Sequence, residues 1–207
     1  MKIELNLNII LLSIIFIILH EFDIYIIFMI FIILHEIAHL FVGIIIGLKP
    51  KIFHINPLGM SIEFYMFQSR SIWKKIVTYF AGPMFNFLMS IVFYFIPIKL
   101  NLKMEIIYTN ILLGIFNLIP MMPLDGGRIL KEILIKKFGN KDATIFMNYL
   151  TKSILVLITF IYSILILKIK NFEIFLLIVY LWYLKYLEDK KVRTVIKAYE
   201  TVEENLK

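Results

Sequence analysis

The sequence predicts an all-α polytopic membrane protein with about six transmembrane helices and a short membrane-associated β-hairpin. The first observation behind this is composition: 61% of the 207 residues are hydrophobic, and the mean hydropathy is +0.88. Soluble domains are only about half apolar, and a chain of this size cannot bury such an excess in one core. The second observation is that the apolar residues fall into runs near the roughly 20 residues that a spanning helix needs.

Six apolar runs are candidate spans. They cover approximately residues 3–19, 24–48, 72–98, 104–119, 153–167 and 172–187. After the last run the chain becomes charged, and we expect a short cytoplasmic helix there. The sequence therefore divides into a transmembrane domain at 1–187 and a charged tail at 188–207.

The 22 Lys and Arg residues are distributed unequally between the two sides that six spans define. Eighteen fall on the side of the N-terminus, the 49–75 and 128–152 loops and the tail, and four fall on the other side. Basic loops remain cytoplasmic, so we expect a multi-pass cell-membrane protein with both termini in the cytoplasm. The lysines lie between apolar runs rather than on a soluble module, which argues against a nucleic-acid partner.

Residues 50–68 do not have the pattern of a spanning helix. Prolines and glycine interrupt them, and β-favouring residues flank a Pro57-Leu58-Gly59 turn signal, which predicts a hairpin at or in the membrane surface. Its edge strand could pair with an extended substrate segment. Just before it, the spacing of Gly43 and Gly47 predicts the close approach of another helix.

The strongest chemical signal is His35-Glu36-Ile37-Ala38-His39, inside the second run. Residues four apart share one helix face, so both imidazoles can reach one metal ion. Glu36 lies beside them, as in the H-E-x-x-H arrangement in which Glu is the general base of zinc metalloproteases. A chance match would leave ionisable groups inside an apolar span, where an ionised carboxylate costs about 2.5–3.5 kcal/mol. We therefore interpret the motif as a site for one Zn²⁺ ion.

The other two histidines are weaker candidates for metal ligands. His20 precedes Glu21, but no histidine follows at the fourth position, and the pair falls at the end of the first run. We interpret it as interfacial. His54 falls within the predicted hairpin and is interpreted as an ordinary polar residue of that segment.

Catalytic zinc takes three protein ligands and keeps one position for water, so a third ligand must come from elsewhere. Asp125 is the best candidate, because it follows Pro120 and Pro123 at the end of the fourth run. Non-helical backbone at membrane depth lines protein or a watery cavity. Alone, Leu-Asp-Gly-Gly would be an ordinary turn, but beside the histidine motif it predicts a metal ligand.

Together these motifs resemble the site-2 protease family of intramembrane metalloproteases. The match rests on His35–His39 with Asn117-x-x-Pro120-x-x-Pro123-Leu-Asp125-Gly-Gly, and on Ala81-Gly-Pro-x-x-Asn86 in the third run. The order of motifs and the six-span layout are most similar to the stage IV sporulation type, which processes pro-sigma-K. That type carries a nucleotide-binding CBS domain after its last span, and residues 188–207 are too few to form one.

The resemblance implies His35, His39 and Asp125 as zinc ligands and Glu36 as the catalytic base. It implies that Asn117 and Pro123 help to position substrate near the metal. We expect a zinc metalloendopeptidase of regulated intramembrane proteolysis, which cleaves a membrane-tethered protein precursor such as a sporulation sigma-factor precursor. Its partners would be that substrate, the bilayer and membrane proteins that inhibit or regulate it.

Other chemistries fit less well. The sequence has no Cys, which excludes a cysteine nucleophile, and it has no Gly-x-Ser-x-Gly motif of a serine enzyme. Asp125 has no aspartate in another run that could share its proton. The alternatives that stay open are a metal-binding membrane transporter, since ionisable residues in spans also mark ion pathways, and an inactive protease-like scaffold.

Overall fold

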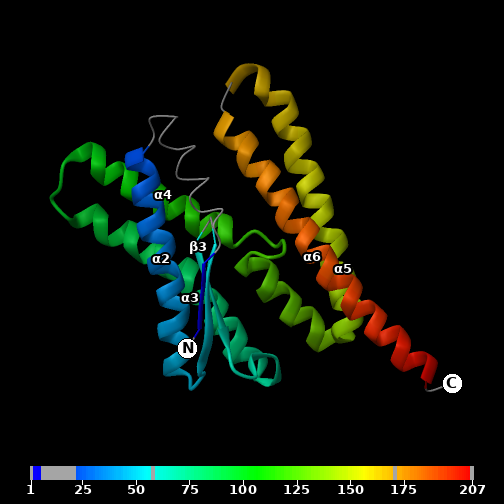
Figure 1. The fold of residues 1–207 in the computed structure, drawn as a ribbon. Coiled ribbons are helices and arrows are strands. Elements are labelled where there is room, and N and C mark those ends of the chain that lie inside the picture. Colours follow the sequence, from blue (N-terminus) through cyan, green and yellow to red (C-terminus); the bar gives the residue numbers. More distant parts are fainter. Residues whose placement is uncertain (1, 6–21, 57–58, 170–171, 206–207) are drawn as a thin grey trace. The chain divides into compact units, whose positions relative to one another are not determined.

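The computed structural model describes residues 2–5, 22–56, 59–169 and 172–205. The chain divides into two compact units, Met1–Leu118 and Ile119–Lys207. Both are dominated by helices, as the sequence predicts, and the sheet belongs to the first unit (Figure 1).

Three helices form the frame of the first unit. They are α2 (Phe22–Ile45), α3 (Ile72–Phe95) and α4 (Leu100–Asn117), and α3 packs against both of the others. Their core contains Phe31, Ile32, Ile106 and Leu113, with the ring of Phe93 edge-on to that of Phe31. This packing places α3 beside the one turn of α2 that carries histidines.

A three-stranded sheet lies in the same unit. It contains β1 (Lys2–Leu5), β2 (Pro50–Asn56) and β3 (Gly59–Phe64), in the order β1-β2-β3. Strands β2 and β3 are antiparallel, which confirms the predicted hairpin, and β1 is parallel to β2. The prediction of a span starting at residue 3 is wrong for residues 3–5. Their alternation of apolar and charged residues has the two-residue period of a strand.

The C-terminus of α2 is fixed by a glycine and a lysine. Gly47 has φ +84°, and hydrogen bonds from the amides of Gly47 and Leu48 to the carbonyls of Ile44 and Gly43 close the last turn. This is the Schellman arrangement, in which a left-handed residue follows the helix. Lys74 of α3 donates to the Ile46 carbonyl at 2.7 Å, which satisfies one of the carbonyls that a helix end leaves unpaired.

Gly43 has a different role from the predicted one. The sequence predicts that another helix approaches it, but its close neighbour is Phe64 of β3, whose Cζ would lie 2.5 Å from a Cβ at position 43. The missing side chain makes room for an aromatic ring. The hairpin is thereby packed onto the helix that carries both histidines.

The second unit is a pair of long helices, α5 (Asp125–Ile169) and α6 (Phe172–Asn205), which pack against each other. Gly139, with φ +83°, interrupts α5, so the chain runs as helices on either side of a sharp bend. Residues 128–152, predicted as a loop, are therefore helical. The segment is predicted as a loop because it lies between two apolar runs. It contains one glycine, Gly139, and no proline, so little in its sequence interrupts a helix. The charged residues from 188 onward continue α6 without a break.

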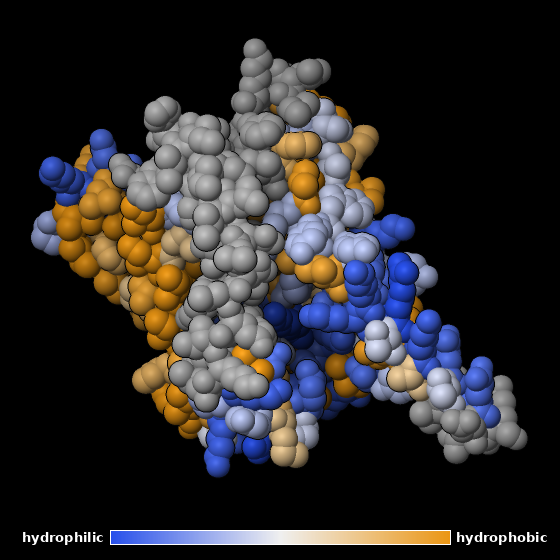
Figure 2. All heavy atoms as spheres, viewed as in Figure 1, coloured by the Kyte–Doolittle hydropathy of each residue, from blue (hydrophilic) through white to orange (hydrophobic). Residues whose placement is uncertain are grey.

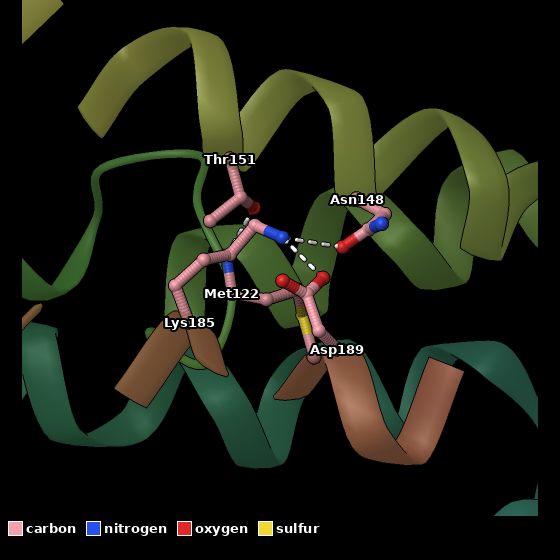
Figure 3. A network of polar contacts seen from close by, with 5 residues as sticks. All are labelled: Met122, Asn148, Thr151, Lys185 and Asp189. Atoms are coloured by element: carbon pink, nitrogen blue, oxygen red, sulfur yellow. Dashed lines mark hydrogen bonds and ion pairs between the residues drawn. The ribbon is translucent and has the colours of Figure 1, made fainter. Parts of the chain in front are cut away.

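A polar cluster lies between α5 and α6 (Figure 3). The ammonium of Lys185, which is 3% exposed, donates to Asn148 at 2.7 Å and also to Asp189 one turn along α6. One turn along α5 from Asn148, the fully buried Thr151 accepts a hydrogen bond from the amide of Met122 at 2.9 Å. These contacts join α6 to α5, and α5 to the segment that precedes it.

Three helices in the described residues are long and apolar enough to cross a membrane: Ile24–Ile45, Ile72–Phe95 and Asp125–Leu165. They correspond to the predicted second, third and fifth runs. The predicted fourth and sixth runs form α4 and α6, which are not among the three. The first run lies mostly outside the described residues, as does His20 with Glu21.

The exposed surface supports membrane insertion. An apolar stripe runs along the outside of α2, made of Ile26, Ile30, Ile33, Ile37, Phe41 and Ile44, each at least 40% exposed. In Figure 2 apolar side chains cover much of the visible side of the first unit, while hydrophilic side chains gather over the C-terminal part of α6. Such a continuous apolar surface has no counterpart on a typical soluble monomer.

Replacing Lys185 with Met is expected to lower the stability of the α5–α6 pair. Removing one member of a buried charged pair costs about 3–5 kcal/mol. Asp189 is 31% exposed, so we expect the effect to be smaller, about 2–3 kcal/mol. Thermal unfolding of the purified protein in detergent measures it. Lys197→Met, at an exposed position of the same helix, is the control, and equal shifts for the two variants would contradict the role of the cluster.

Candidate metal centre

The histidine pair lies on the inner face of α2. His35 and His39 are 2% and 6% exposed, although α2 presents an apolar stripe on its other side. Their rings meet edge to face with centroids 4.7 Å apart, and the two Nε2 atoms are 3.1 Å apart. The predicted convergence of the two imidazoles is therefore present.

Partners on α3 orient both rings. The Nδ1–H of His35 donates to Oδ1 of Asn86, and the Nδ1–H of His39 donates to the carbonyl of Thr78 at 2.6 Å. A neutral imidazole that donates through Nδ1 carries its lone pair on Nε2. The two lone pairs consequently face one common point. In metal-binding histidines the nitrogen that does not bind the metal makes this type of hydrogen bond.

Gly82 provides the space at that point. A Cβ built on Gly82 would meet Nε2 of both His35 and His39. Helix α3 thus passes so close that any side chain would fill the position where the two lone pairs converge. The site is a cradle bounded by two nitrogens and an uncovered stretch of backbone.

The dimensions fit zinc. With zinc–nitrogen distances of about 2.0–2.1 Å, two ligands of a tetrahedral ion lie about 3.3 Å apart. The separation of 3.1 Å between the two Nε2 atoms is close to that value. The donor set also suits zinc, because neutral imidazole is a usual ligand of this ion.

Asp125 belongs to the second unit and begins α5. Its side chain is 5% exposed, and the N-terminus of a helix favours a negative charge. The segment before it is tightly folded. The amide of Met122 is held by Thr151, and Leu124 donates to the Met121 carbonyl at 3.0 Å. A Cβ on Gly127 would meet the Met121 backbone, so this glycine lets the segment fold back on the first turn of α5.

The remaining predicted residues have clear places. Glu36 lies on α2 next to His35 and is half-buried. Asn117 is the last residue of α4, and its amide donates to the Leu113 carbonyl at 3.1 Å. Pro123 is half-buried in the segment before α5. His54 lies in β2, paired with Ser61, which agrees with its interpretation as a hairpin residue.

The comparison with protein families identifies the chain. The model described as Peptidase family M50 matches residues 24–102 and 99–161, which is more than half of the sequence. The chain belongs to peptidase family M50. This is the site-2 protease family of membrane zinc metalloproteases, as the motifs of the sequence predict. The pro-sigma-K-processing type is not distinguished by this match.

Two individual proteins similar to this M50 chain are also named as proteases. A zinc metalloprotease of Methanocaldococcus jannaschii is 44% identical over 72 residues, covering 31% of this chain and 21% of the relative. The match thus spans about a fifth of that relative's length. The solved structure of a site-2 protease from Methanocaldococcus jannaschii has a TM-score of 0.71 and 27% identity, covering 90% of this chain and 89% of that one. Zinc is accordingly the cofactor of this M50 site.

Sequence reasoning identified the histidines but not their supports. The Ala-Gly-Pro-x-x-Asn motif contains Gly82 and Asn86, yet its spacing does not reveal that one opens the site and the other orients His35. Thr78 acts through its backbone carbonyl, which no side-chain pattern reports. Thr151 acts on a segment 29 residues away and has no signal in the sequence.

Gly82→Ala is expected to abolish stoichiometric zinc binding, because the new methyl group would occupy the point where both Nε2 atoms converge. Zinc in the purified protein can be counted by atomic emission. Gly114→Ala is the matched control. It also adds a methyl group inside a helix, there against the flexible ring of Phe87, and should keep its zinc. Full zinc occupancy in Gly82→Ala would overturn the assignment of this cradle.

Proposed function

We propose that this chain is an intramembrane zinc metalloendopeptidase that cleaves a membrane-tethered protein precursor within or beside the bilayer. The observation that carries the proposal is the buried histidine pair, with both Nε2 atoms 3.1 Å apart over Gly82. Buried ionisable groups in a lipid-facing helix are costly and mark function. Membership of family M50 supports peptide-bond hydrolysis as that function.

In this proposal His35, His39 and Asp125 hold the ion. All three side chains are buried. Two neutral imidazoles and one carboxylate give the three protein ligands of a catalytic site and leave one position for water. Bound zinc lowers the pKa of water to about 7 and polarises the carbonyl to be attacked.

Glu36 is the general base. It takes a proton from the attacking water and later passes it to the leaving amine of the cleaved peptide bond. Its place next to His35 on α2 supports this role, because adjacent positions on a helix differ by about 100° around the axis. Glu36 can therefore stand beside the metal without being one of its ligands.

Asn117 and Pro123 position the substrate near the metal, as the resemblance to site-2 proteases implies. The hairpin is suited to the same task. In the described sheet β2 is central, and β3 is paired with β2 on one side only. An extended substrate segment could add to β3 through main-chain hydrogen bonds, and a protease requires an extended peptide.

The proposed arrangement of the chain in the membrane follows from the distribution of charge. The chain is taken to cross the membrane six times with both termini in the cytoplasm, because 18 of its 22 Lys and Arg residues fall on one side of that layout. Residues 1–187 then form the protease domain, and 188–207 form a cytoplasmic tail.

A membrane-tethered transcription-factor precursor of the sporulation sigma-factor kind is the first substrate class to test, with membrane-embedded regulator proteins as further partners.

Glu36→Gln is expected to abolish cleavage while zinc content stays at the wild-type level. Glutamine keeps the size of the side chain and cannot accept the proton. Co-expression with a candidate membrane-tethered precursor, read by gel shift, measures cleavage, and atomic emission measures zinc. A metal transporter that used Glu36 as a ligand would instead lose the metal in this variant, which would favour that alternative.

Asp125→Asn is expected to weaken zinc binding by at least tenfold, because a neutral amide replaces the one anionic ligand of the proposed set. Chelator competition on the purified protein measures the affinity. Asp142→Asn removes a carboxylate from an exposed position of the same helix and should leave the affinity unchanged. If both variants bound zinc equally well, Asp125 would not be the third ligand.

A further inference from the structure

Two asparagines are completely buried in the first unit. Asn86 on α3 and Asn110 on α4 are both 0% exposed, and α4 otherwise contributes apolar residues to the core. A buried amide is unfavourable unless each of its polar ends has a partner. The hydrogen-bond partners of these two side chains therefore indicate what role the side chains have.

The two amides form a line of hydrogen bonds that ends at His35. Asn110 donates through Nδ2 to the backbone carbonyl of Ile106 at 2.9 Å. Asn86 donates through Nδ2 to Oδ1 of Asn110 at 3.0 Å. The Nδ1–H of His35 then donates to Oδ1 of Asn86. The line thus joins α4, α3 and α2.

The direction of this line is fixed at its far end. A backbone carbonyl can only accept, so the Nδ2 end of Asn110 must face Ile106 and its Oδ1 must face Asn86. Asn86 must then donate through Nδ2, which turns its own Oδ1 toward His35. An oxygen can only accept from the ring, so Nδ1 of His35 carries the hydrogen and Nε2 carries the lone pair.

We propose that Asn86 and Asn110 are positioning residues of the metal site, a one-way relay that sets the tautomer and ring orientation of His35. This deepens the proposed function and rests on it. His39 needs no such relay, because its Nδ1–H donates to the backbone carbonyl of Thr78. The two histidines are thus held by different means, one by backbone and the other by a chain of side chains that begins on α4.

The relay makes a prediction opposite to that of simple packing. Leucine is close in size to asparagine and suits an apolar core, whereas aspartate does not. A packing role therefore predicts that Leu is tolerated and Asp is not. The relay predicts the reverse for zinc, because a buried carboxyl group is neutral and, like the amide, offers one acceptor oxygen and one donor. Its carbonyl oxygen accepts from His35 or from Asn86, and its hydroxyl donates where the amide did, to Asn110 or to the Ile106 carbonyl.

The test is zinc affinity by chelator competition, measured on monodisperse protein in detergent. Asn86→Leu and Asn110→Leu should weaken zinc binding, by about 10–100-fold for Asn86, the usual effect of losing a partner of a metal-binding histidine. The effect at Asn110 should be smaller, since Asn86 keeps its contact with His35 but can now turn its amide. Asn86→Asp and Asn110→Asp should stay within about threefold of the wild type.

Two control variants separate a failure of this inference from a failure of the proposed metal site on which it rests. Ser90→Ala removes another buried polar group of α3, one that donates to its own helix at Phe87, and should not change zinc affinity. His35→Ala should abolish zinc binding. If His35→Ala kept its zinc, the proposed metal site itself would fail. If His35→Ala lost zinc while Asn86→Leu bound it as tightly as the wild type, only the relay would be overturned.

Discussion

The central constraint on this structure is that two imidazoles must be held in place by hydrogen bonds inside a helix that faces lipid. Within a bilayer there is no water to satisfy stray donors, so the Nδ1–H of each ring needs an acceptor from the protein. Helix α3 supplies both partners, through the Thr78 carbonyl and the Asn86 side chain. The packing of the three helices of the first unit can be understood as the means of bringing these groups within reach.

The same constraint explains the small residues. Backbone must come close to the rings to offer a carbonyl, and Gly82 permits that approach and leaves the metal position open. Gly43 lies a few residues further along α2. Its missing side chain leaves room for the ring of Phe64, which packs the hairpin onto the helix. Gly82 and Gly43 are therefore sites of contact between specific elements.

Much of this architecture follows from local patterns in the sequence. The helical runs, the hairpin around Pro57 and the histidine pair each have a signature within a few residues, because hydrophobic periodicity and metal-ligand spacing are local properties. The Leu-Asp-Gly-Gly signal likewise singled out Asp125. What escaped prediction depends on contacts between distant segments. The pairing of residues 2–5 with β2 and the partners of His35 are set by packing, which a single sequence does not encode locally.

The bend at Gly139 has a geometric consequence for the segment that carries Asp125. A straight helix from 125 to 151 would place its two ends about 40 Å apart. Thr151 nevertheless reaches back to the amide of Met122, so the chain must reverse its course, and it does so where φ is +83°. There is ample room for a side chain at this position, and only handedness excludes one. Stereochemistry at a single exposed residue thus determines whether Thr151 can meet the segment that precedes α5.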